Sequence, residues 1–249
     1  MINYLWLVFA ILWFIAFSCR WNWWRRNKPG IPILMYHYIG IAPKGEKNKK
    51  LWVSVKKFRQ QMEYLKKYGY NPITFKELKD EFRPHNSVII TFDDGAENNY
   101  TNAFPILKEY NFKACIFLVT ERYEFSIEQL KEMQDYGIEF EAHTKTHPNL
   151  TQMIDDDRIK EEIEGCKKIL EKRLNTPITV FAYPYGAGAY DEKIKQQVKE
   201  AGYSFACGIK QGKVTLPIID KYNLQRLLVR GDDLMIDFIL NLKRGRSRL

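Results

Sequence analysis

Short apolar runs alternate with helical patterns through most of this 249-residue chain. The strand-like runs cover residues 33–36, 88–92, 114–119, 138–142, 180–182, 204–207 and 224–229. Apolar residues at three-to-four spacing lie between them, at 55–65, 100–110, 127–136, 157–174 and 191–201. This alternation is typical of parallel βα units, so the sequence predicts an α/β fold.

Polar side chains that can do chemistry follow several of these strands directly. They are His37, Asp93, Asp94, His143 and the turn at Pro184-Tyr185. Active sites lie at the carboxyl ends of the strands in a (β/α) barrel, and a doubly wound open sheet also places ligands there. We favour the barrel because at least four different strands converge on one site.

The runs Asp93-Asp94-Gly95 and His143-Thr144-Lys145-Thr146-His147 contain donors that suit zinc. One carboxylate with two histidines leaves coordination positions open, which is typical of a catalytic metal site. The second aspartate is then a spare base, and the set suggests hydrolysis. The spacing is not that of a zincin, because no glutamate follows His143.

Each motif also has a simpler interpretation. Aspartate before glycine often ends a strand in a turn, and His143 and His147 could be ordinary loop residues. His37 alone could be a satisfied core histidine, and His85 precedes its strand and receives no role. The common location of three histidines and two aspartates at one predicted face argues for function.

The first segment differs from the rest of the chain. Residues 2–18 carry no charge, and Cys19, Arg20 and an aromatic-basic stretch at 21–26 follow them. The length just suffices for one transmembrane helix, and tryptophans followed by arginines suit the membrane interface. We therefore expect an anchor at 1–24, a linker at 25–30 and one domain at 31–249. A buried helix or a cleaved signal peptide is the alternative, but a basic leading region is absent.

The net charge of +9 is unevenly placed, with the basic excess in residues 20–43, 44–67 and 243–248. Solvated faces and a basic rim beside membrane lipid explain these stretches. No recognised reader motif accompanies the charge, so we expect no nucleic-acid partner. No CxxC occurs among the four cysteines, and we expect free thiols, buried at Cys115, Cys166 and Cys207.

Three ordered strings carry a family resemblance: TFDDG at 91–95, HTKTH at 143–147 and FAYPYG at 181–186. Together they resemble the polysaccharide deacetylases of carbohydrate esterase family 4, the NodB-homology domain. The likeness runs from about residue 31 to the end. It implies a distorted (β/α) barrel of about seven strands and metal-dependent removal of N-acetyl groups from a glycan. It is closest to the branch of poly-N-acetylglucosamine deacetylases.

The resemblance also implies residue roles. Asp93 matches the catalytic base, Tyr185 the residue whose backbone N–H faces the oxyanion, and His37, in Met35-Tyr36-His37, the general acid. The metal ligands would be Asp94, His143 and His147. The implied cofactor is a divalent metal, zinc first, with cobalt, nickel or iron as alternatives.

Two positions depart from the family pattern. An arginine usually orients the base from the position that is Ala182 here, so another group must hold Asp93. The late leucine-x-histidine motif is missing, because no histidine follows His147, which leaves His37 as the acid. Leu227 or Leu228 could line an acetyl pocket.

Two other functions remain open at this point. A barrel glycosidase would use paired carboxylates, about 5–9.5 Å apart, on either side of a bond. The missing arginine at Ala182 would also suit an inactive, membrane-tethered glycan-binding module. Because acetylated wall and matrix polymers lie outside the membrane, the resemblance implies an extracytoplasmic domain. The basic residues after the anchor argue for the opposite orientation.

Overall fold

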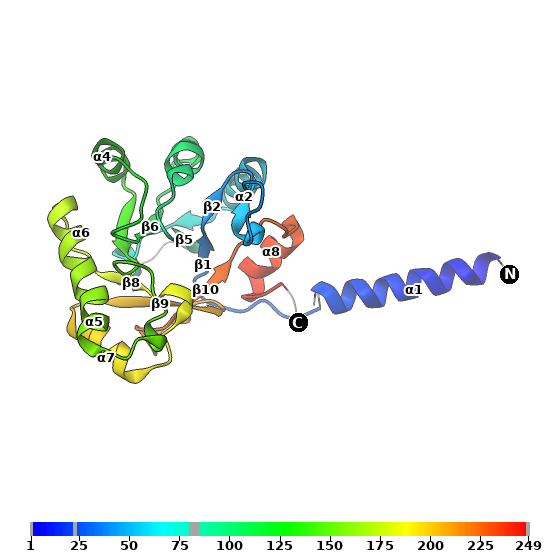
Figure 1. Ribbon diagram of the computed structural model, residues 1–249. Helices are drawn as coiled ribbons and strands as arrows, with labels where there is room; N and C mark the ends of the chain where they lie inside the picture. The colour runs from blue at the N-terminus through cyan, green and yellow to red at the C-terminus, as the bar shows by residue number, and fades with distance from the viewer. Residues whose placement is uncertain (1, 22–23, 80–84, 248–249) are drawn as a thin grey trace.

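Seven parallel strands close into a ring at the centre of the computed structural model, which describes residues 2–21, 24–79 and 85–247 (Figure 1). The order around the ring is β1-β10-β9-β8-β7-β6-β5, and a parallel pairing of β1 with β5 closes it. The strands are β1 Ile33–Tyr36, β5 Ser87–Phe92, β6 Cys115–Leu118, β7 Glu139–Ala142, β8 Val180–Ala182, β9 Phe205–Gln211 and β10 Leu224–Leu228. The predicted barrel is therefore confirmed, and the open doubly wound sheet is wrong.

Helices surround the outside of this ring (Figure 1). They are α2 Val55–Lys67, α3 Phe104–Tyr110, α4 Ile127–Tyr136, α5 Asp156–Lys160, α6 Cys166–Leu174, α7 Glu192–Glu200 and α8 Met235–Arg244. Single π-turns, η3 Asn99–Ala103 and η5 Glu161–Gly165, precede α3 and α6. The helix expected at 157–174 therefore contains a π-turn. Three short strands were not expected: β2 Tyr38–Ile39, its partner β3 Trp52–Val53, and β4 Asn71–Pro72 beside β5.

Helix α2 illustrates how the apolar spacing becomes packing. Ser54 caps the helix by accepting a hydrogen bond from Lys57 N, as expected for a serine at that position. Phe58, Met62 and Leu65 are fully buried against the barrel. Burying each such side chain stabilises the fold by about 1.5–3 kcal/mol, so this face holds the helix in place.

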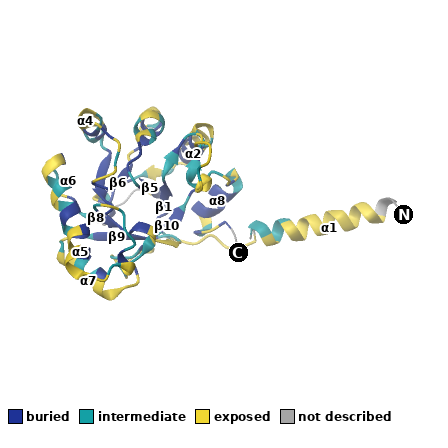
Figure 2. Ribbon diagram, viewed as in Figure 1, coloured by how far each residue is buried: buried dark blue, intermediate teal, exposed yellow. Residues whose placement is uncertain are grey.

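The N-terminal helix α1 (Ile2–Trp21) projects away from the barrel (Figure 1), and most of it is exposed (Figure 2). Residues Tyr4–Trp21 are long and apolar enough to cross a membrane, although a signal sequence would have the same character. At the end of α1, Arg20 Nη1 and Trp21 Nε1 donate hydrogen bonds of 3.0 and 3.1 Å to Asp237 Oδ1 on α8. All four cysteines are free, and Cys115, Cys166 and Cys207 are buried, as expected.

Candidate active site

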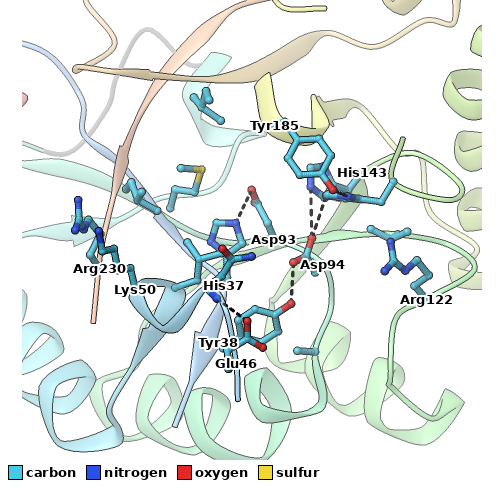
Figure 3. A pocket seen from close by; sticks show the side chains of 18 of the residues that line it. His37, Tyr38, Glu46, Lys50, Asp93, Asp94, Arg122, His143, Tyr185 and Arg230 are labelled. Carbon is cyan, nitrogen blue, oxygen red and sulfur yellow. Dashed lines mark hydrogen bonds and ion pairs between the residues drawn. The ribbon is translucent and has the colours of Figure 1, made fainter. Parts of the chain in front are cut away.

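A cleft of about 950 Å³ opens at the carboxyl ends of the barrel strands. Every side chain that the sequence analysis selected for chemistry lines it: His37, Asp93, Asp94, His143, His147 and Tyr185. His37 follows β1, the two aspartates follow β5, and His143 follows β7. Figure 3 shows His37, His143 and Tyr185 gathered around Asp93 and Asp94. The predicted convergence of several strand ends on one site is confirmed.

The Asp-Asp-Gly turn aims its two carboxylates at different partners. Asp94 and Gly95 both have left-handed backbone, with φ of 78° and 77°. A Cβ on Gly95 would lie 2.7 Å from Leu118 Cδ2 and from Tyr123 Cβ, so only glycine fits there. The turn directs Asp94 toward His143 and His147, while Asp93 is buried in the barrel (Figure 3).

Asp94, His143 and His147 form a compact set of metal-type donors. Asp94 Oδ1 lies 3.6 Å from His143 Nε2 and 3.4 Å from His147 Nε2. One donor atom from each of the three residues lies within 4.8 Å of the others. Asp94 Oδ1 is buried and has no hydrogen-bond partner among the described residues. A buried carboxylate oxygen facing two ring nitrogens fits a cation, since an unpaired charged oxygen is costly to bury.

Each imidazole is oriented by a contact at Nδ1, the ring nitrogen that does not face Asp94. His143 Nδ1 lies 2.8 Å from Ala182 O, so its N–H donates to that carbonyl and Nε2 keeps its lone pair for the site. His147 Nδ1 lies 3.2 Å from Tyr185 Oη. Burial lowers the pKa of both rings below the ordinary value, against the opposing effect of the nearby aspartates. The neutral imidazole, which is the form that binds metal, is thereby favoured.

The loop that carries His147 is held from behind by Glu162 on η5. Glu162 Oε2 accepts hydrogen bonds from Lys145 N at 2.8 Å and Thr146 N at 2.9 Å. Glu162 Oε1 accepts another from Thr146 Oγ1 at 2.6 Å. The backbone of His147 itself is left-handed, with φ of 67°. These contacts hold a strained turn that brings the second histidine toward Asp94.

Arg226 supplies the guanidinium that is missing at Ala182. From β10 it forms a two-pronged ion pair with Asp93, with Nη1–Oδ1 at 2.7 Å and Nη2–Oδ2 at 2.8 Å. Both side chains are buried, and Arg226 Nε also donates to Gly208 O. The sequence analysis missed this residue. A lone arginine within the apolar strand Leu224–Leu228 was the available signal.

This pair sets the charge of Asp93. Burial alone raises the pKa of a carboxyl group, but the Arg226 cation and then the two histidines nearby outweigh that effect. The pKa of Asp93 consequently lies well below its usual range, and the carboxylate is ionised at neutral pH.

His37 completes the charged centre of the cleft. Its Nε2 lies 4.0 Å from Asp93 Oδ2. Its Nδ1 is buried and has no hydrogen-bond partner in the part of the chain that the structure describes. Burial lowers the pKa of His37, and Asp93 partly opposes this. The ring therefore has a carboxylate beside Nε2 and a second nitrogen, Nδ1, that no described group binds.

The turn after β8 forms another wall of the cleft. Tyr185, in the short helix η6 (Pro184–Gly186), has left-handed backbone with φ of 57°. Its ring packs edge-on against His147. Of the two leucines considered for an acetyl pocket, Leu228 lines the cleft and Leu227 is buried in the core. His85, which received no role, is exposed beside the amino end of β5.

Known proteins are similar to this chain in sequence and in fold. The family model described as polysaccharide deacetylase matches residues 81–206. YxkH of Bacillus subtilis, which is named for this family, is 32% identical over 200 residues, covering 76% of this chain and 68% of YxkH. The chain belongs to the polysaccharide deacetylase family. The enzyme class predicted from the three sequence motifs is thereby confirmed.

Two further proteins extend the likeness. The poly-beta-1,6-N-acetyl-D-glucosamine N-deacetylase of Staphylococcus epidermidis is 30% identical over 217 residues, which are 78% of this chain and 74% of that enzyme. The deacetylase PplD of Streptococcus pyogenes, solved in complex with acetate, superposes with a TM-score of 0.76 at 28% identity. That match covers 86% of this chain and 99% of PplD, and it supports the same barrel for the whole domain.

Proposed function

We propose that this deacetylase removes N-acetyl groups from a polysaccharide of N-acetylglucosamine and releases acetate with the help of a divalent metal. One observation carries the proposal: an ionised, arginine-paired Asp93 stands beside the donor set Asp94, His143 and His147 in a single cleft. The relative from Staphylococcus epidermidis is named for this reaction on poly-beta-1,6-N-acetyl-D-glucosamine. PplD, with the same fold, was solved with acetate.

The donor set suits a cation of intermediate softness. One carboxylate and two neutral imidazoles match zinc, and cobalt, nickel or iron accept the same ligands. Asp94, His143 and His147 would hold a divalent ion there, which would supply polarisation of the acetamide carbonyl and a lower pKa for a water molecule. The ion would pair with Asp94 Oδ1, a buried oxygen that has no hydrogen-bond partner among the described residues. Because that unpaired oxygen is costly to bury, we expect the ion to bind tightly.

The remaining polar groups divide the proton transfers. Asp93 accepts the proton of the attacking water, and Arg226 holds its carboxylate in place during that step. General-base assistance of this kind contributes about 10²–10⁴-fold. We assign the backbone N–H of Tyr185 to the oxyanion that forms, where loss of one donor costs about 3–4 kcal/mol.

The leaving amine requires a proton before it can depart. His37 is the group we assign to that step, because its ring lies in the cleft on the side of Asp93 away from the metal donors (Figure 3). The amide C–N bond breaks as His37 protonates the nitrogen, and the products are acetate and a free amino sugar. The Asp93 carboxylate beside the ring favours the imidazolium form that donates this proton, against the opposing effect of burial.

The glycosidase and the inactive glycan-binding module fit the cleft less well than a deacetylase does. A glycosidase needs two carboxylates on either side of a bond, but both oxygens of Asp93 are bonded to Arg226 and Asp94 faces two histidines. An inactive glycan-binding module was suggested by the missing arginine at Ala182. Arg226 provides that charge from another strand, so this reason no longer applies.

We further propose that residues 1–24 anchor the chain in a membrane, that 25–30 form a linker and that the domain at 31–249 faces outward. Acetylated wall or matrix polymers lie on that side, whereas the basic residues that follow α1 would favour the cytoplasm. Protease added to intact cells decides between the two: cleavage of the domain supports the outward orientation, and full protection contradicts it.

Acetate release is the direct test of the enzymatic proposal. The detergent-solubilised full chain is incubated with poly-β-1,6-N-acetylglucosamine, chitin oligomers and peptidoglycan, before and after chelation. We expect activity that is lost with the chelator and restored by zinc or cobalt. Asp94→Asn should lower the bound metal measured by mass spectrometry, independently of turnover.

The role of His37 is tested in the same assay. His37→Gln should lower kcat by about 10²–10⁴-fold, while His85→Gln, a matched change at an exposed histidine outside the cleft, should not. A chain that binds metal but releases no acetate from any of these glycans contradicts the proposed reaction.

A further inference from the structure

Cationic side chains stand on both sides of the catalytic centre. Lys47, Lys49 and Lys50 line one wall of the cleft, and Arg122, from the segment after β6, lines the opposite wall. Figure 3 shows Lys50 and Arg122 on either side of Asp93 and Asp94. A substrate that reaches the aspartates therefore passes between two positive walls.

None of these four cationic side chains is paired with an acidic side chain among the described residues. All four side chains are exposed, and none takes part in an ion pair within the part of the chain that the structure describes. Arg230, a fifth cation in the cleft, differs, because it forms a two-pronged pair with Asp232. The charges of the lysines and of Arg122 thus remain available to a ligand.

The acids of the cleft rim are engaged elsewhere. Glu46 Oε1 accepts a hydrogen bond of 2.7 Å from Asn48 N within the same loop. Glu124 Oε2 accepts one of 2.8 Å from Glu97 N. Both carboxylates keep their charge, but these two acids stand against the three lysines and Arg122, so the rim as a whole keeps an excess of positive charge facing the substrate path.

The lysine loop is fixed to the barrel rather than loosely attached. Lys49 and Lys50 belong to the short helix η1 (Lys49–Leu51), and Lys50 O accepts a hydrogen bond of 2.8 Å from Gly231 N. A Cβ on Gly231 would lie 1.9 Å from Trp52 O, so this close approach depends on glycine. Trp52 in turn stacks on Tyr38 with ring centroids 4.6 Å apart. These contacts hold the lysines at the cleft wall.

We propose that the natural substrate is an acetamido-sugar polymer that carries anionic groups, either carboxylates or phosphodiesters, on sugars next to the one being deacetylated. This inference rests on the proposed function and specifies its substrate. A neutral glycan gains nothing from four unpaired cations, whereas an anionic one is attracted along the cleft. The product sugar carries an ammonium group, which the same cations repel, so product release is favoured.

A membrane surface is the other anionic partner that lysines can meet. The present lysines line a concave cleft together with His37 and Asp94, and a flat bilayer does not enter such a space. The geometry thus favours a flexible glycan chain over lipid headgroups.

The test compares three oligomers of equal length: neutral, carboxylated and phosphodiester-bearing acetamido-sugar chains. Acetate release and calorimetric binding are measured with the detergent-solubilised full chain at low and high ionic strength. We expect lower KM for one or both anionic oligomers and a loss of that preference in high salt. The two anionic arms identify which charged group the cleft prefers.

Replacing Lys47, Lys49 and Lys50 together by glutamine should raise KM for the preferred anionic oligomer about tenfold. The kcat for that oligomer and the KM for the neutral oligomer should stay the same. The matched control removes three exposed charges from α4, α6 and α7, through Lys131→Gln, Lys172→Gln and Lys199→Gln.

Equal KM and equal binding for neutral and anionic oligomers would overturn the inference while leaving the deacetylase intact. Absence of acetate from every oligomer counts against the reaction instead, and calorimetric binding then still decides the charge preference. The chain is also reconstituted into vesicles with and without anionic lipid. If the lysine replacements change only vesicle-dependent activity, the lysines face lipid and the inference fails.

Discussion

Replacing Arg226 by glutamine should shift the pH dependence of this enzyme more than any surface change. The arginine donates two charge-assisted hydrogen bonds, of 2.7 and 2.8 Å, to the buried carboxylate of Asp93. Removal of one partner from such a buried pair costs about 3–5 kcal/mol, since the other charge is left unpaired. At 1.36 kcal/mol per pH unit, Asp93 would ionise about 2–4 pH units higher than in the wild-type enzyme.

The sign of the effect on activity and stability follows from the position of the pKa. In the wild-type chain the pKa of Asp93 lies below the unfolded value of about 3.9. The ion pair therefore stabilises the fold above that pH and loses this contribution as the pH falls through the folded pKa. In Arg226→Gln the acid limb of kcat/KM should move upward by about two pH units. The difference in unfolding free energy between the two proteins should shrink below about pH 4.

The assay is acetate release by the full chain in detergent from pH 3 to 9, together with urea unfolding at pH 3 and 7. Arg226→Lys keeps a charge but not the planar fork, so its acid limb should move less than that of the glutamine variant. Arg59→Gln, which removes an exposed arginine paired with Glu109, serves as the control. An unchanged acid limb in Arg226→Gln would refute the assignment of Asp93 as an arginine-held base.

Two further changes test the supports of the site. Glu162→Ala removes three hydrogen bonds to the His147 loop and should weaken zinc binding, measured by titration, about 10–100-fold. Glu164→Ala, at a half-buried residue of the same turn that pairs with Lys160 and Lys168, should leave zinc affinity unchanged, and equal losses in both variants would contradict the idea. Glu141 is buried, and burial raises its pKa to about 8. The protonated carboxyl group therefore contributes fully to the free energy of unfolding below about pH 4.3, and this contribution is lost as the pH rises toward 8. Glu141→Gln should flatten this decline of unfolding free energy with pH, and an unaltered slope would show that Glu141 is already ionised.

Most of the site could be predicted from the sequence because its residues lie directly at the ends of strands. His37, Asp93 and His143 each follow an apolar run, and parallel strands bring their carboxyl ends to one edge. Side chains a few residues apart in one turn, such as Asp94 or His147, need no long-range information to be placed. The fold class followed from the same alternation of strands and helices.

Contacts between segments that are distant in the sequence could not be predicted in this way. Glu162 supports the His147 loop because η5 packs behind it, and nothing in the acidic run around 161–164 distinguishes that residue. The π-turns η3 and η5 likewise interrupt helical patterns that look continuous in sequence. Helix boundaries were therefore less predictable than strand ends.

The sequence by itself determined the barrel class, six residues that line the cleft and the absence of the usual arginine at Ala182. Only the tertiary structure decided what takes that arginine's place. Arg226 lies 133 residues from Asp93 in the chain. Closure of the ring brings β10 next to β1, and β1 next to β5, so an inward-facing side chain on β10 can reach a carboxylate on β5. All strands of a closed barrel share one interior, and a charge can reach the base from any of them.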